Sequence, residues 1–135
     1  MTGMAGRRTV DARWEGGMRA VVTTGAFEVV ADEPPTAGGT DSGPQPTDLF
    51  LASIASCFAL AMAWAADKQG VDLSPLHVRV TGTYDGPRFS RVDIEVHSSA
   101  PTAVLDDLLR EAERVCYVTN TLRELPVLRV ARATP

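Results

Sequence analysis

Hydrophobic and polar residues alternate in the first third of the chain, which is the pattern of β-strands with one buried face. Residues 18–24 alternate in this way until Gly25, and the alternation resumes over residues 27–31. A break at glycine between two alternating runs predicts a β-hairpin. Residues 12–14 continue the pattern upstream and predict an earlier strand.

The same alternation returns in the second half of the chain. Residues 77–84 and 91–97 form two runs that are joined through residues 85–87, Asp-Gly-Pro, which are typical turn residues. The second run is the clearer one, because valine and isoleucine at every second position face one side and charged residues face the other. Residues 127–132 predict a last strand.

Residues 49–66 are almost entirely apolar and predict a long helix, with a start signal at residues 46–48, Pro-Thr-Asp, and an end at Gly70. This apolar length reaches the lower limit of a membrane span. Amphipathic segments surround it, however, and favour a buried core helix and no membrane partner. A helix that is apolar on all sides must be covered on all sides, and so small a chain has limited means to do so alone. We therefore expect an obligate dimer that shares this helix.

Residues 103–115 carry apolar residues at helical spacing, and residues 117–124 predict a further helical turn after Cys116. Residues 32–47 form a loop rich in glycine and proline, and so long a loop is usually either functional or disordered. The order of elements predicts an α+β fold. We expect residues 1–135 to form a single domain with a flexible N-terminus over residues 1–12.

Composition narrows the classes of function. The chain has 13 Lys and Arg against 17 Asp and Glu, a net charge of -4, which argues against a nucleic-acid or anionic-membrane partner. A hydrophobic content of 44% permits a packed core. No apolar run follows the basic N-terminal residues, so we expect no signal peptide. Two cysteines without an export signal then indicate a reducing compartment, the cytoplasm.

Cys57 and Cys116 are the only cysteines, and two interpretations of them stay open. Free cysteine behaves as a small hydrophobe, and Cys57 lies in the middle of the apolar helix, so it is plausible as an inert core residue. A functional Cys57 must be a thiolate, which an apolar surrounding disfavours unless a cation or hydrogen-bond donors compensate. If the two helices pack together, the two cysteines can meet and form a disulfide.

Three segments carry a resemblance to a known family. They are residues 43–50, Gly-Pro-Gln-Pro-Thr-Asp-Leu-Phe, residues 52–58, Ala-Ser-Ile-Ala-Ser-Cys-Phe, and residues 113–122, Glu-Arg-Val-Cys-Tyr-Val-Thr-Asn-Thr-Leu. Together they resemble the signatures of the OsmC/Ohr superfamily, the osmotically inducible protein C and organic hydroperoxide resistance proteins. The resemblance covers residues 14–132, and the spacing of the segments fits as well.

The resemblance implies an OsmC-like fold, with antiparallel sheets and two central helices in an intertwined homodimer. It also implies a thiol-dependent peroxidase that needs no cofactor and no metal. Cys57 matches the peroxidatic cysteine, which attacks an organic hydroperoxide and becomes a sulfenic acid, and Cys116 matches the resolving cysteine. An external dithiol reductant then restores both thiols.

The chain departs from the family's activating residues. Thr47 stands where organic hydroperoxide resistance proteins carry a glutamate, and Asp48 is one position later. When residues 19–21 are aligned with the N-terminal strand of organic hydroperoxide resistance proteins, Gly16 takes the position of the family's arginine. The OsmC-type pattern would place that arginine in the loop over residues 32–47, which contains none. Asp48, Thr47 and Arg19 are therefore the candidate supporting residues, with Arg13 and Arg123 as other sources of positive charge. Tyr117 also replaces the proline that is usual after the second cysteine.

Two other functions remain open at this point. A dimer that keeps the fold without the activating residues can act as a redox sensor or bind a hydrophobic small molecule. Cys57, Cys116, His77 and His97 are numerous enough for a four-ligand zinc site, but their spacing fits no zinc pattern.

Overall fold

A computed structural model describes residues 6–134. Within them the chain divides into two compact units, an N-terminal unit up to Ser53 and a C-terminal unit from Ile54 onward. Each unit is described by itself. Helix α1 (Pro46–Gln69) begins in the first unit and continues into the second.

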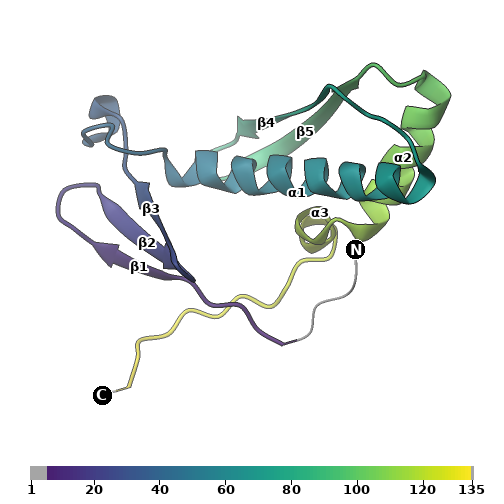
Figure 1. Cartoon of the computed structure of the whole chain (residues 1–135). Helices are drawn as coiled ribbons and strands as arrows, with labels where there is room; N and C mark the ends of the chain where they lie inside the picture. Colours follow the sequence, from purple (N-terminus) through teal and green to yellow (C-terminus); the bar gives the residue numbers. More distant parts are fainter. Residues whose placement is uncertain (1–5, 135) are drawn as a thin grey trace. The chain divides into compact units, whose positions relative to one another are not determined.

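The N-terminal unit is built on three antiparallel strands, β1 (Asp11–Trp14), β2 (Ala20–Thr24) and β3 (Phe27–Ala31), in the order β1-β2-β3 (Figure 1). Thr24 pairs with Phe27, so two residues connect β2 to β3. The first of them, Gly25, has a φ of 58°, a conformation that glycine adopts without steric cost. The predicted hairpin and the earlier strand are confirmed.

The long loop after β3 is ordered by one buried acid, Asp32, which is 1% exposed. Its carboxylate accepts hydrogen bonds from the backbone N–H groups of Glu33, Thr40 and Ser42, and from the hydroxyls of Thr40 and Ser42. Gly39 passes so close to the backbone that a Cβ there would lie 1.8 Å from the Glu33 carbonyl oxygen. A short 3-10 helix, Pro35–Ala37, completes the loop.

Helix α1 has 24 residues and is followed by Gly70, whose φ is 66°. The N–H of Gly70 donates to the Asp67 carbonyl, so the predicted end of the helix is confirmed.

By length and composition alone α1 can cross a membrane, and 33% of its most apolar stretch is buried within the chain. Its fully or nearly buried residues are Ile54, Phe58, Ala61, Met62, Ala65 and Ala66.

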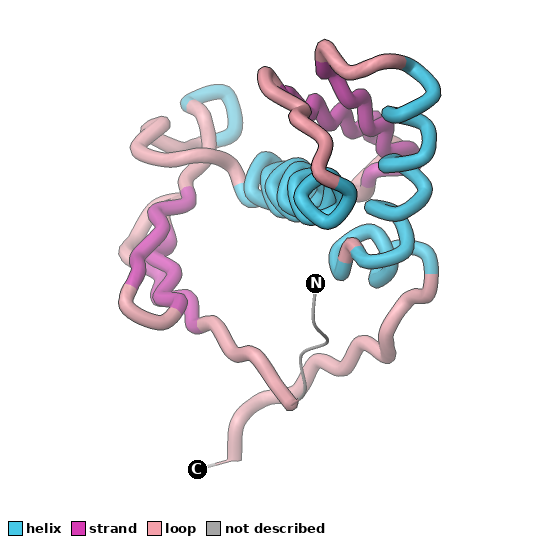
Figure 2. Tube along the Cα trace, turned by 45° about the vertical axis from the view of Figure 1, so that its right-hand side comes forward, coloured by secondary structure: helices cyan, strands magenta, loops and turns pink. Residues whose placement is uncertain are grey.

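The C-terminal unit packs two strands and two helices with the second half of α1 (Figure 2). Strands β4 (Leu76–Tyr84) and β5 (Phe89–Ser98) form an antiparallel pair. Helix α2 (Thr102–Val115) and helix α3 (Tyr117–Arg123) follow. The core combines buried residues of α1 and α2 with half-buried residues of the strands, among them Leu108, Ala112, Val78, Val96 and Ile94.

The strand pair alternates as the sequence predicts. Val78 pairs with Val96, and both pack against the core. His77 pairs with His97 and Arg79 pairs with Glu95, and all four are exposed on the opposite face. The interpretation of β5 as a strand with one buried face is therefore confirmed.

The predicted last strand, residues 127–132, is wrong for the single chain. This segment has no strand, and Val127, Leu128 and Val130 are 90%, 86% and 92% exposed. Alternating apolar residues favour a strand only where a neighbouring strand edge supplies hydrogen bonds, and the described residues offer this segment none. Of the predicted flexible N-terminus, residues 1–5 lie outside the described part, and Asp11 and Ala12 begin β1.

Candidate functional site

Two elements of the C-terminal unit bring the cysteines together. Cys57 lies on α1, one residue before buried Phe58. Cys116 is the residue between α2 and α3, with extended backbone (φ -73°, ψ 112°) that ends one helix and begins the next. Cys116 belongs to the buried core that α1 and α2 share with Leu108 and Ala112, and half-buried Cys57 packs against this core.

The thiols are in direct contact. Cys116 Sγ donates to Cys57 Sγ at 3.4 Å, and both cysteines are free. Cys116 is fully buried, whereas Cys57 is half-buried. A disulfide needs a sulfur–sulfur separation of about 2.0 Å, so an approach of about 1.4 Å suffices to join them. Of the two, Cys57 is the thiol that a small molecule from solvent can reach.

The environment of Cys57 favours its neutral form. Burial raises the pKa of the Cys57 thiol, and the adjacent Cys116 thiol raises it further. The backbone N–H groups of Val118 and Tyr117, at the start of α3, lower it by hydrogen bonding to the sulfur. Sequence reasoning missed these two donors, because nothing in the residue types indicates which amides face a thiol.

No arginine is among the groups that shift the pKa of Cys57 most. The candidate cations of the described residues have other partners. Arg123 pairs with Glu113 at 3.2 Å, Arg13 pairs with Glu15 at 3.1 Å, and Arg19 donates to the Ser42 hydroxyl at 3.4 Å.

The two candidate residues at the start of α1 are remote from Cys57 along the helix. Asp48 precedes Cys57 by nine residues, which is about 13 Å of helix axis and half a turn away in direction. Thr47 is one residue further still. Neither side chain can touch the sulfur of its own chain, so a supporting role for either needs a second copy of the chain.

The C-terminal unit also contains two hollows that share part of their lining. One, of about 250 Å³, is lined by Phe58, Ile94, Leu109, Arg110, Glu113, Thr119 and Arg123. The other, of about 300 Å³, shares Ile94, Thr119 and Arg123 with it and extends along β5. Phe58, the residue after Cys57, lines the first hollow, but neither lining includes Cys57 or Cys116.

The four-residue zinc hypothesis fails in the described residues, where no three His, Cys, Asp or Glu side chains gather into a metal-binding group. Cys57 and Cys116 face each other, and His77 and His97 form a separate ring pair with centroids 5.7 Å apart.

Comparisons with known proteins establish the family and the fold. The family model described as OsmC-like protein matches residues 39–130. No curated protein sequence matches the chain. An OsmC-like protein from Mycoplasma pneumoniae superimposes with a TM-score of 0.75 at 18% identity, over 90% of this chain and 91% of that one.

Two further solved structures are similar. A putative osmotic stress induced and detoxification response protein from Psychrobacter arcticus has a TM-score of 0.74 at 22% identity, over 87% of this chain and 90% of that one. An organic hydroperoxide resistance protein from Legionella pneumophila has a TM-score of 0.67 at 22% identity, over 90% of this chain and 93% of that one. At these identities the likeness establishes the shared fold.

Proposed function

The chain belongs to the OsmC-like protein family, and we propose that it is a thiol-dependent peroxidase that reduces organic hydroperoxides through Cys57 and Cys116. The observation that carries the proposal is the 3.4 Å contact between the two sulfurs, one half-buried and one buried. Solved relatives described as organic hydroperoxide resistance proteins share the fold and support the choice of substrate class.

The proposed chemistry has three steps. The Cys57 thiolate attacks the terminal oxygen of the hydroperoxide, the O–O bond breaks, and the alkoxide leaves and takes up a proton to become an alcohol. Cys57 is then a sulfenic acid. The Cys116 thiol condenses with it, forming the disulfide and releasing water. An external dithiol reduces the disulfide by exchange and is itself oxidised, which suits a reducing cytoplasm.

We also propose that the active form is a homodimer. Ser56, Leu60 and Ala63 line one exposed side of α1 at helical spacing, and Leu60 is 64% exposed. An apolar helix side of this kind is covered by other protein in a stable fold. In a dimer Arg19, Asp48 and Thr47 of a second copy become available to support the Cys57 thiolate.

A second candidate function rests on the raised pKa of Cys57. A thiol that stays protonated near neutral pH reacts slowly with peroxide. The protein is then a redox sensor, or a binder of hydrophobic small molecules that uses the hollow beside Phe58.

A peroxide titration of the reduced protein separates the candidates. We expect cumene hydroperoxide to oxidise the chain rapidly and stoichiometrically to a Cys57–Cys116 disulfide, mapped by mass spectrometry. In Cys116→Ser the Cys57 sulfenic acid should persist and be trapped by dimedone, whereas Cys57→Ser should consume no peroxide. Thr81→Ala, exposed on β4 and outside the thiol contact, is the control and should behave as the parent.

Thiols that remain reduced under a large excess of peroxide would exclude the peroxidase. Slow oxidation to the same disulfide, too slow for turnover with a dithiol, would favour the redox sensor.

A further inference from the structure

The two histidines of the chain lie opposite each other on neighbouring strands. His77 and His97 are the only histidines in 135 residues, and they form a directly opposed pair in the antiparallel register of β4 and β5. Their ring centroids are 5.7 Å apart with planes inclined by 30°. Both are exposed, on the face of the strand pair opposite the core. The proposed peroxidase chemistry does not use them.

The spacing of the rings suits a shared metal ion. With metal–nitrogen bonds of about 2.1 Å, two imidazoles on one tetrahedral ion have ring centroids about 5 Å apart. The observed 5.7 Å therefore needs only a small rotation of two exposed side chains. Directly opposed residues have Cβ atoms about 4.5–5.5 Å apart, and the nearest register shift of this pair is at Thr83/Tyr84. The backbone already holds the two donors in place.

The surroundings decide which ions fit. Arg79 and Glu95, the next pair along the same face, oppose each other with opposite charges, so the local field does not exclude a cation. No third protein donor completes a metal-binding group among the described residues. Water then fills the remaining positions, which suits ions that bind imidazole strongly on their own. Imidazole is a preferred ligand of copper, nickel and zinc, and Cu²⁺ binds most tightly in that series.

We propose that His77 and His97 together bind one divalent late transition-metal ion, with Cu²⁺ held more tightly than Ni²⁺ or Zn²⁺. The ion joins β4 to β5 on the exposed face and is independent of the thiol pair. Because the two donors lie 20 positions apart in sequence and are placed by the folded register, binding favours the native state and stabilises it.

Nuclear magnetic resonance of the histidine rings tests the proposal directly, since the chain without an affinity tag gives signals from two rings only. Adding Zn²⁺ to the reduced protein at pH 7.5 should shift both ring Cε1–H signals together and saturate at one ion per chain. The midpoint of thermal unfolding should rise by about 3–8 °C at saturating Zn²⁺. Cu²⁺ oxidises thiols, so its tighter binding is measured in the Cys57→Ser/Cys116→Ser variant.

Substitutions give the matched comparison. His77→Gln and His97→Gln should each weaken Zn²⁺ binding at least tenfold, while Thr81→Ala, exposed on the same face of β4, should bind as the parent does. Ring signals that do not move in a hundredfold excess of Zn²⁺ would overturn the proposal. So would a shift of one ring alone, or equal affinity in the histidine variants, each of which would locate the ion elsewhere.

Discussion

The reactivity of Cys57 depends on the balance between burial and two backbone amides. Burial and the neighbouring Cys116 thiol raise the pKa of Cys57, and the N–H groups of Val118 and Tyr117 oppose them. The sequence places Cys57 in the middle of one helix and Cys116 at the end of another, and the 3.4 Å separation of their sulfurs depends on how closely α1 and α2 pack. Residue types do not encode that distance, because it is set by the volumes of all the side chains between the helices.

The pH dependence of alkylation tests the direction of this pKa shift. Because the thiolate is the reactive form and the single chain raises the pKa of Cys57, the rate at which iodoacetamide modifies Cys57 in the monomeric Leu60→Glu variant should still be rising at pH 9. Peptide mass spectrometry follows Cys57 and Cys116 separately in the reduced protein. A rate that levels off near neutral pH in that monomer would contradict the raised pKa, whereas levelling off in the parent dimer alone would indicate a cation supplied by the second copy, as the peroxidase proposal requires.

Two buried or half-buried carboxylates, Asp32 and Glu111, join parts of the chain that are distant in sequence. Sequence patterns predicted the helices and five strands to within a few residues, since hydrophobic period and turn residues act locally. The sequence of the loop before α1 is compatible with either a functional or a disordered segment. The structure shows an ordered loop, because the buried carboxylate of Asp32 accepts hydrogen bonds from residues as far along the chain as Ser42.

Replacing Asp32 should loosen this loop. The hydrogen bonds of Ser42, and next those of Thr40, hold the pKa of the Asp32 carboxyl far below its usual range. A depressed pKa means stability that is present above the unfolded value, about 3.9, and lost as the pH falls toward the folded value. We expect Asp32→Asn to lower the unfolding temperature by several degrees at pH 7.

The difference between parent and variant should narrow as the pH falls below about 4. Asp41→Asn, an exposed carboxylate in the same loop, is the control. An unchanged unfolding temperature for Asp32→Asn, measured by circular dichroism, would show that other contacts order the loop.

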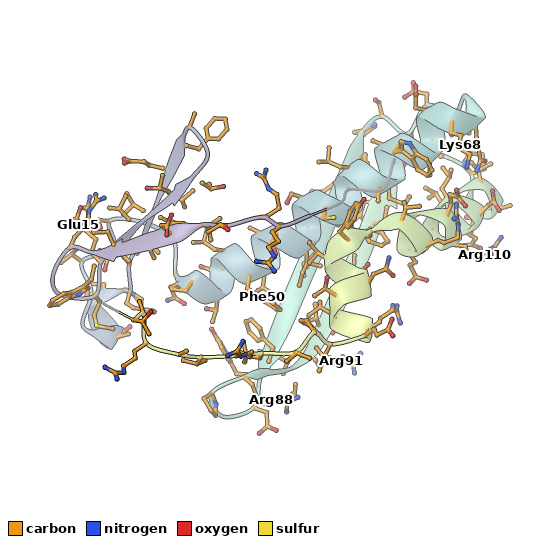
Figure 3. All side chains as sticks on the ribbon, turned by 90° about the horizontal axis from the view of Figure 1, so that it is seen from below. Glu15, Phe50, Lys68, Arg88, Arg91 and Arg110 are labelled. Atoms are coloured by element: carbon orange, nitrogen blue, oxygen red, sulfur yellow. The ribbon has the colours of Figure 1, made fainter. Side chains whose placement is uncertain are left out.

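Glu111 links two helices of the C-terminal unit. It accepts from Lys68 of α1 at 3.0 Å and from Arg114 of α2 at 2.7 Å, and these bonds lower its pKa to about 2. Figure 3 shows Lys68 at the end of α1 and Arg110 on the neighbouring α2. The stability from this carboxylate is therefore present above about pH 4.5 and lost as the pH falls toward 2.

Glu111→Gln should reduce the unfolding temperature slightly at pH 7, because both cations are largely exposed to solvent. The effect should vanish near pH 2. Thermal unfolding of Asp106→Asn, an exposed carboxylate on the same helix, gives the baseline. If Glu111→Gln lowered the unfolding temperature equally at pH 7 and pH 2, the charge of Glu111 would not be the source of the stabilisation.

The molecule as a whole presents apolar surface that the single chain does not cover. Leu60 is exposed on α1, and Leu125, Val127 and Val130 are exposed in the segment after α3. Residues 127–132 do not form the predicted strand, because a strand needs the edge of a neighbouring strand for its hydrogen bonds. We infer that a second copy supplies the covering surface.

Leu60→Glu should weaken the dimer strongly, since it places a charge in the proposed interface while leaving the fold of the single chain unaffected. Sedimentation velocity at micromolar concentration should give a dimer for the parent and for the conservative Leu60→Met, and a monomer for Leu60→Glu. A parent chain that sediments as a stable folded monomer would be enough to reject the dimer.

The sequence by itself determined the α+β fold, the OsmC-like family and the identity of the two thiols, because hydrophobic period, turn residues and local motifs are properties of neighbouring residues. Tertiary structure decided what depends on residues far apart in the chain. It set the contact between Cys57 and Cys116, the amides that face the sulfur, and the opposition of His77 and His97. The physical reason is that side-chain packing and strand register bring such groups together, and both are settled only when the whole core forms.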